Sequence, residues 1–340
     1  MIDGEDAPDP ESVMTAFGLE GPLMAWAAVS GAWSNRVFRL EAGGRAFAVK
    51  EMRNPRGDAR WEEWLAESWS FELLAIEAGV AAPAPVASLA GGGCLARVSR
   101  GDGTAASVPV RVHRWVDGQP FSPAAVAPEC ARRAGQVLAT MHGLGVRPRD
   151  RSVFPVLNTE NAGRWPELTG AAHRSGAEWA RQMTAAASSV SLIAELAQSC
   201  VARPGDEVMS HGDIDQKNLI STARGPVLCD WDVAAPLVPL RELADVAMSL
   251  ACWQDFSIAR EVVRAYRASG GDDTEITPPD LGQPMMTGLG WAAFNVERAL
   301  GRRPASPSEV ALSRELLPHL LAAIPGQVGA ALRITDILRI

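Results

Sequence analysis

Residues 211–218 read HGDIDQKN and residues 227–232 read VLCDWD, and these two stretches decide the fold. Asn218 follows Asp213 by five positions, which one tight loop can span, so that both side chains return to a common point. Asp230 follows Asn218 by twelve positions, and this spacing suits a hairpin of two short strands. The spacing therefore predicts that all three side chains surround one site.

These three side chains are hard oxygen donors: two carboxylates and one amide carbonyl. Such donors suit Mg²⁺, which takes few protein ligands, keeps several waters and accepts phosphate oxygens. We expect Asn218 and Asp230 to hold the metal. Asp213 is then available to orient and deprotonate an attacking hydroxyl, which is the arrangement used for phosphoryl transfer by protein kinases.

The two stretches resemble the catalytic and metal motifs of the aminoglycoside phosphotransferase family. The family pattern is His-Gly-Asp, four variable residues and Asn, then Asp-Trp-acid after a hydrophobic strand, and every fixed position is present. That family is similar to the choline kinases. The resemblance implies an α+β, protein-kinase-like fold of two lobes, with ATP and Mg²⁺ as cofactors. It also implies that His211 mainly braces the loop.

The rest of the chain fits a small β-rich N-lobe and a large, mainly helical C-lobe. Alternating apolar residues on both sides of Gly43-Gly44 predict a β-hairpin. Residues 61–78 predict an amphipathic helix that Gly79 ends. From residue 123 onward the pattern is mostly helical, with helices predicted at 256–268, 288–300 and 308–323 among others, and with one β-rich island at 208–229.

We therefore expect three parts in the chain. They are a nucleotide-binding N-lobe at 1–112, a hinge at 113–118, and a C-lobe at 119–340 that carries the catalytic and metal motifs and the acceptor site.

Lys50 and Lys217 are the only lysines among 32 basic residues. Period-two alternation places Lys50 on one face of a strand with two alanines, and Phe47 and Val49 on the other face, which packs on the helix. Small alanines beside an ammonium make a strip that can face ATP. Lys50 resembles the strand lysine of kinases, which implies that it holds the α- and β-phosphates.

A lysine in that position needs a carboxylate partner to fix its conformation. Glu67 precedes Phe71 and Leu74 at helical spacing, so we expect it to share their inward face and to orient Lys50. Glu63 and Glu72 are the alternatives.

Residues 30–35 read SGAWSN and resemble the nucleotide loop of the family, in which small residues let backbone N–H groups approach phosphate. Ala32 stands where a second glycine is common. The resemblance implies nucleotide contacts by Ser30, Gly31, Ser34 and Asn35. The connector at 112–118 resembles the adenine-binding segment, with backbone groups at about His113 and Trp115 reading the adenine edge.

Two further residues keep two interpretations each. Asp232 would assist the metal or face a cationic substrate. Lys217 would touch phosphate or pair with Asp215.

Composition excludes several classes of function. The 340 residues are 47% hydrophobic, enough for a large core, and carry a formal net charge of −8, which disfavours nucleic acid as a partner. No run reaches about 18 apolar residues, so we expect no membrane span. Five dispersed cysteines without a CxxC pair and an acidic N-terminus favour a cytoplasmic enzyme. We expect either a monomer or a homodimer.

These features together predict an ATP- and Mg²⁺-dependent O-phosphotransferase with a small-molecule alcohol as acceptor. A cationic antibiotic, an aminoglycoside or a related compound, fits the acidic chain, and its phosphorylation would confer resistance. The alternatives are a kinase of an amino alcohol, a homoserine-like compound or a sugar, and a catalytically silent nucleotide-binding protein. A protein kinase is disfavoured because no Ala-Pro-Glu-like segment follows Asp230.

Overall fold

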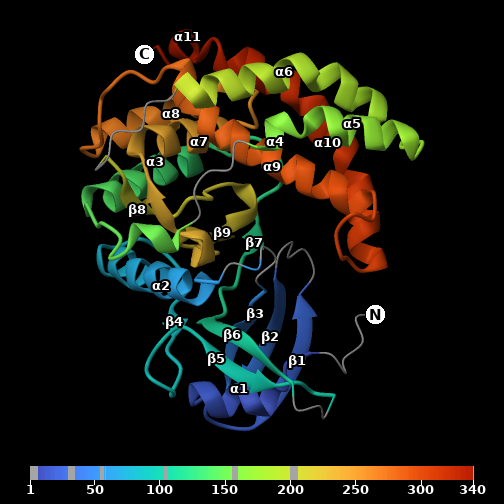
Figure 1. The fold of residues 1–340 in the computed structure, drawn as a ribbon. Coiled ribbons are helices and arrows are strands. Elements are labelled where there is room, and N and C mark those ends of the chain that lie inside the picture. Colours follow the sequence, from blue (N-terminus) through green and yellow to red (C-terminus); the bar gives the residue numbers. More distant parts are fainter. Residues whose placement is uncertain are drawn as a thin grey trace. The chain divides into compact units, whose positions relative to one another are not determined.

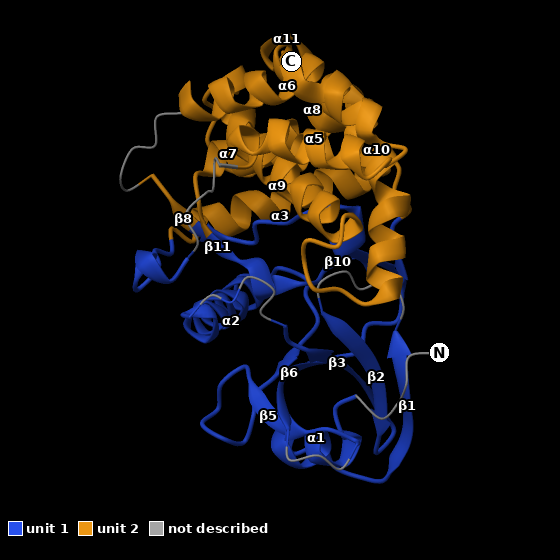
Figure 2. Ribbon diagram, turned by 45° about the vertical axis from the view of Figure 1, so that its right-hand side comes forward, with its two compact units in different colours: residues 1–121, 146–154, 209–235 blue, residues 122–145, 155–208, 236–340 orange. Residues whose placement is uncertain are grey.

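The computed structural model describes residues 7–29, 35–53, 57, 59–102, 106–154, 160–199 and 206–339 (Figure 1). The chain divides into two compact units, each made of segments that are distant in sequence (Figure 2). Unit 1 comprises residues 1–121, 146–154 and 209–235, and unit 2 comprises residues 122–145, 155–208 and 236–340. The two motif stretches therefore belong to the same unit as the N-terminal strands. The expected lobes are consecutive ranges of the sequence, whereas each unit combines several separate ranges. The expected lobe boundaries therefore stay a prediction.

The larger of the two sheets in the described part of unit 1 is a six-stranded antiparallel sheet. Its strand order is β1-β2-β3-β6-β4, and β5 also pairs with β6. The strands are β1 (Leu23–Val29), β2 (Arg36–Ala42), β3 (Arg45–Glu51), β4 (Pro85–Val86), β5 (Ala96–Ser99) and β6 (Ser107–Arg114). The predicted hairpin is confirmed: β2 and β3 are joined by Gly43 and Gly44, whose φ angles of 54° and 72° favour glycine.

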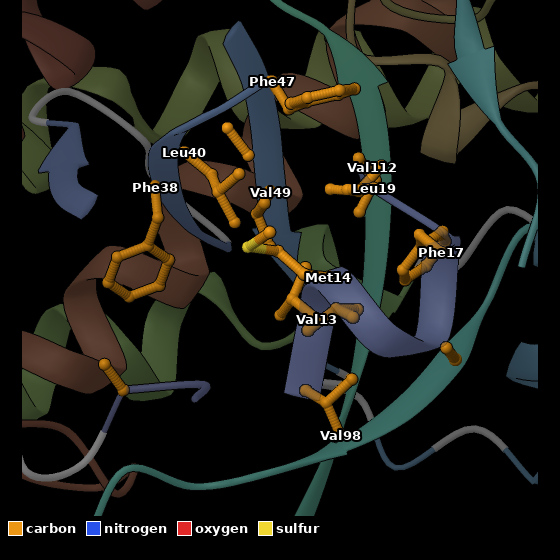
Figure 3. Packing of buried hydrophobic residues seen from close by; sticks show 14 of the residues in the cluster. Val13, Met14, Phe17, Leu19, Phe38, Leu40, Phe47, Val49, Val98 and Val112 are labelled. Atoms are coloured by element: carbon orange, nitrogen blue, oxygen red, sulfur yellow. The ribbon is translucent and has the colours of Figure 1, made fainter. Parts of the chain in front are cut away.

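One face of this sheet packs against α1 (Pro10–Phe17), which Asp9 caps through the N–H of Ser12. Phe47 and Val49 are buried in a hydrophobic cluster that also contains Val13, Met14 and Phe17 of α1 (Figure 3). The helix that covers them is thus α1, and the expectation that the predicted helix at 61–78 does so is wrong. The opposite face of β3 presents Ala46, Ala48 and Lys50, as the alternation predicts.

The rest of unit 1 lies around α2 (Trp61–Glu77) and a second, smaller sheet. That sheet has the order β10-β9-β7 and contains β7 (Gln119–Pro120), β9 (Leu219–Thr222) and β10 (Gly225–Leu228). The described part of the unit also contains the short 3₁₀ helices η2 (Arg151–Val153), η3 (Gln216–Asn218) and η4 (Trp231–Val233).

Unit 2 is helical in its described part. Its helices are α3 (Pro128–Gly143), α4 (Glu160–Gly163), α5 (Trp165–Arg174), α6 (Ala180–Ser199), α7 (Pro239–Leu250), α8 (Phe256–Ala268), η5 (Pro278–Leu281), α9 (Gly282–Ala299), α10 (Pro307–Ala331) and α11 (Ile334–Leu338). The short strands β8 (Val208–Ser210) and β11 (Ala235–Leu237) lie where the sequence passes between the units. Among the described helices of the chain, none combines the length and the hydropathy that crossing a membrane requires.

Candidate active site

The loop at 211–218 is held by its own hydrogen bonds and by one to the strand that follows. The backbone N–H of Asp213 donates to Nδ1 of His211 over 3.3 Å, so this ring nitrogen accepts and the proton lies on Nε2. Nε2 donates to the carbonyl oxygen of Cys229 over 3.0 Å. Gly212 has a φ of 79°, which favours glycine. These bonds give His211 the bracing position that the motif implies.

Both carboxylate oxygens of Asp213 have partners within the loop. Nδ2 of Asn218 donates to Oδ2 over 2.9 Å and to the backbone carbonyl of Asp213 over 2.8 Å. Nζ of Lys217 donates to Oδ1 over 2.8 Å and also contacts Asp215. Burial alone would lower the pKa of Lys217, but the two carboxylates raise it above its ordinary value. Lys217 therefore makes the pair with Asp215 and holds Asp213 as well.

Strands β9 and β10 form the hairpin that the spacing from Asn218 to Asp230 predicts. At its open end, the N–H of Cys229 donates to the carbonyl oxygen of Asn218 over 2.9 Å. Asp230 then adopts φ 67° and ψ 53°, a left-handed conformation that costs a residue with a side chain about 1–2 kcal/mol. The hairpin thus returns the chain beside Asn218 immediately before Asp230.

The ammonium of Lys50 contacts the carboxylates of Asp230 and Asp232. Burial alone would lower the pKa of Lys50, but these two carboxylates raise it above its ordinary value. Nδ2 of Asn35 lies 3.5 Å from Oδ2 of Asp232, and Oδ1 of Asn35 accepts the N–H of Arg53 over 2.9 Å. The strand lysine and the second motif stretch thus meet within unit 1.

A buried charge network continues from Asp232 to α2. The guanidinium of Arg111 contacts Oδ1 of Asp232 through Nη1, and it donates to Oε2 of Glu72 through Nη2 over 2.7 Å. Oε1 of Glu72 lies 3.0 Å from Nε2 of His113. The side chains of Arg111 and Glu72 are both 0% exposed. Burial alone would raise the pKa of Asp232, but the neighbouring Lys50 and Arg111 charges hold it well below its ordinary value.

Glu67 does not contact Lys50, contrary to our expectation. Its carboxylate lies 3.4 Å from the N–H of Arg149 and 3.9 Å from that guanidinium. The inward face of α2 was misjudged because Leu74 is 42% exposed, whereas Glu72 is fully buried. Of the three candidate glutamates, Glu72 is the one that reaches the charge network, through Arg111 and not through Lys50.

The segment expected to read adenine begins within β6. His113 lies opposite Ala48 in β3, with its imidazole on Glu72. The N–H of Trp115 donates to the carbonyl oxygen of Ala46 over 3.0 Å, so in this structure that donor is used within the sheet. Of the expected nucleotide loop, Asn35 is described, whereas Ser30, Gly31 and Ser34 lie outside the described residues.

Sequence reasoning missed the face of α2 that holds the second motif stretch. Nε1 of Trp64 and Oγ of Ser68 both donate to the carbonyl oxygen of Ala234, over 2.8 and 2.9 Å. The ring centroids of Phe71 and Trp231 lie 6.1 Å apart. The spacing of Trp64, Ser68 and Phe71 is a helical signal that could have marked this face.

The oxygen donors available to a metal are few. Among the described residues, no group of three or more His, Cys, Asp and Glu side chains has the arrangement of a metal site. The amide nitrogen of Asn218 donates to Asp213, so the amide oxygen is the atom of this side chain that is left to bind a cation. Together with Asp230 this donor set fits Mg²⁺, which takes most of its ligands from water and phosphate.

The chain was compared with curated protein sequences, with solved structures and with models of protein families. No curated protein sequence matches it. A spectinomycin phosphotransferase, APH(9)-Ia, solved with ADP and spectinomycin, has a TM-score of 0.72 and 12% identity, covering 96% of this chain and 97% of that one. An amicoumacin kinase solved with AMP-PNP and Ca²⁺ has a TM-score of 0.63 and 12% identity, covering 92% and 91%. A microcompartment-associated aminopropanol kinase has a TM-score of 0.61 and 14% identity, covering 97% and 98%.

These likenesses confirm the predicted α+β, kinase-like fold, with a β-sheet in the N-terminal region and helices in the C-terminal region. The model of the phosphotransferase enzyme family, APH, matches residues 25–277, which is most of the chain. The motif stretches at 211–218 and 227–232 lie inside that match, and the chain belongs to this phosphotransferase family.

Proposed function

We propose that the chain transfers the γ-phosphate of ATP to a hydroxyl group of a small molecule in an Mg²⁺-dependent reaction. The observation that carries the proposal is the convergence of two motif stretches in one unit. Asp213 is held by Asn218 and Lys217, and the hairpin after them leads to Asp230, which Lys50 contacts. These are the residue types that phosphoryl transfer needs.

In this proposal Asp213 accepts the proton of the acceptor hydroxyl as the hydroxyl oxygen attacks the γ-phosphorus. The bond between that phosphorus and the bridging oxygen breaks, and ADP leaves. Asn218 and Lys217 hold the Asp213 carboxylate in place for this proton transfer. Positioning of this kind supplies much of the rate acceleration in phosphoryl transfer.

The remaining residues bind and neutralise the nucleotide. Asn218 and Asp230 would hold Mg²⁺, which when bound offsets charge on the phosphate oxygens. Lys50 would bring its positive charge to the α- and β-phosphates. We keep Ser30, Gly31, Ser34 and Asn35 as the nucleotide loop, and His113 and Trp115 as the start of the adenine-binding connector.

For the acceptor we propose an alcohol that also carries an amine, with a cationic antibiotic first and an amino alcohol metabolite second. The net charge of −8 supports a cationic acceptor. Relatives of the fold are named for spectinomycin, for amicoumacin and for aminopropanol, which supports both classes.

The test is a panel of antibiotics and amino alcohols incubated with ATP and Mg²⁺, followed by ADP release and product mass. We expect one class to gain the mass of one phosphate. Asp213→Asn should lower turnover by about 10²–10⁴-fold while ADP affinity is kept. Asp336→Asn, which makes the same change at a carboxylate that is 74% exposed and lies outside the two motif stretches, should keep the turnover of the wild type.

Full turnover by the Asp213→Asn variant would contradict the assignment of the base. ADP binding without turnover on any acceptor would favour a silent nucleotide-binding protein.

A further inference from the structure

Arg111 is a fully buried cation whose contacts reach both α2 and the second motif stretch. It lies on β6 directly opposite Lys50 of β3, so two positive side chains share one face of the sheet. The fork of the guanidinium contacts Glu72 with one nitrogen and Asp232 with the other. A buried guanidinium in this position needs both carboxylates, because an uncompensated buried charge is strongly unfavourable.

Asp232 joins the two cations. One of its oxygens contacts Arg111 and the other contacts Lys50. The carboxylate therefore lies between two positive charges that would otherwise face each other across neighbouring strands. Its side chain is 7% exposed, so protein groups surround it.

Helix α2 also binds the turn that contains Asp232 at a second point. Trp64 and Ser68 donate to the carbonyl oxygen of Ala234, two residues beyond Asp232. The ion pairs fix the side chain of Asp232, and these hydrogen bonds fix the backbone that follows it. The turn containing Asp230 is therefore held from α2 on one side and from β3 and β6 on the other.

We propose that Arg111 is a positioning residue: bound to Glu72 and Asp232, it fixes the turn at 230–232, and through Asp232 it fixes the ammonium of Lys50. In this arrangement the helix glutamate acts on the lysine through an arginine and an aspartate and not by direct contact. The consequence for turnover rests on the proposed function, whereas the consequence for the order of the turn does not.

The decisive variant is the double substitution Arg111→Met with Glu72→Gln. It removes the pair without leaving the Glu72 charge buried alone, so we expect the chain to fold. A merely structural role predicts wild-type kcat once folding is kept. A positioning role predicts a kcat lowered by about 10–100-fold with a smaller change in KM for ATP, because small displacements of reacting groups have effects of this size.

A matched control is available on the same helix and the same sheet. Glu62 of α2 pairs with Arg97 of β5, and both side chains are more than half exposed. Arg97→Met with Glu62→Gln makes the same chemical change at the surface, so kcat should remain unchanged. Arg111→Lys is a third variant. It keeps the positive charge but lacks the two guanidinium nitrogens that contact the two carboxylates, so its kcat should lie between those of the double variant and the wild type.

Hydrogen exchange tests the proposal without any turnover. The N–H of Cys229 donates to Asn218, and that of Ala234 donates to Trp231 over 3.1 Å. We expect amides at 229–234 to exchange faster in the Arg111 and Glu72 double variant and at the wild-type rate in the control pair. Unchanged exchange at 229–234, or unchanged kcat in the double variant, would overturn the proposal. A wild-type chain that phosphorylates no acceptor would overturn the proposed function, and the exchange result would still decide the role of Arg111.

Discussion

Glu72 and Glu67 both lie on α2, but their carboxylates differ in burial and in the partner that each one contacts. Glu72 is 0% exposed and compensates a buried guanidinium, whereas Glu67 is 16% exposed beside the exposed Arg149. Glu72→Gln should therefore destabilise the fold by about 3 kcal/mol, because it leaves Arg111 with one carboxylate. Glu67→Gln should cost less than about 1 kcal/mol. Urea unfolding of the two variants checks this, and equal midpoints would contradict it.

The two lysines allow a second measurement at single residues. Lys217 is 44% exposed and Lys50 is 14% exposed, and carboxylates raise the pKa of both. An amine-acylating reagent should therefore modify Lys217 before Lys50 in the native chain, as read by peptide mass spectrometry. Unfolding in urea should remove the difference. Faster modification of Lys50 in the native chain would show that its pairs with Asp230 and Asp232 do not form.

Individual residues also show where sequence reasoning ends. The alternation around Lys50 predicted its face correctly, because period-two geometry is local to one strand. The partner of Lys50 was not predictable in this way, since Asp230 and Asp232 are 180 and 182 positions away. Glu72 was only one of two alternatives, together with Glu63, because the sequence does not distinguish a buried glutamate from an exposed one until its partner, Arg111, is known.

Helices α3 and α8 pack closely against each other at a glycine of α3. A Cβ on Gly135 of α3 would lie 2.3 Å from the carbonyl oxygen of Val262, whereas one on Gly143 of the same helix would meet nothing within 4 Å. Gly135→Ala should destabilise the chain by about 1–3 kcal/mol through overpacking. Gly143→Ala should be neutral or stabilising by up to about 1 kcal/mol, because alanine is the better helix former. Thermal unfolding distinguishes the two, and a stabilised Gly135→Ala variant would contradict the close packing.

Elements with a strong local signal were predicted well, and others were not. Helix α8 and the β9–β10 hairpin follow their patterns closely. Helix α9 begins at Gly282, six residues before the predicted start at 288. The predicted start was too late because Gly282 and Pro284 are of residue types that usually break helices. Helix α10 continues to Ala331 through Pro318 and Pro325, beyond the predicted end at 323. Here packing within the unit outweighs the local preference of proline and glycine.

At the scale of the molecule, unit 1 is assembled from three separate segments. A fragment of residues 1–121 contains Lys50 and Arg111 but lacks Asp232, and Phe71 loses Trp231. We expect this fragment to unfold without a cooperative transition. Fusing residues 209–235 to its end through a flexible linker should sharpen the transition, as circular dichroism would show. A fragment 1–121 that unfolds cooperatively by itself would contradict this.

The division into segments has a consequence for how the chain is made. Residues 122–208 must be synthesised after the first segment and before the one that completes unit 1. At roughly 5–20 residues per second this takes about 4–17 s. For that interval the nascent sheet carries a lysine and an arginine without their shared counter-ion and a helix face without its cover. Transiently exposed surface of this kind promotes aggregation, so the yield of folded protein should depend on how translation pauses between these two segments.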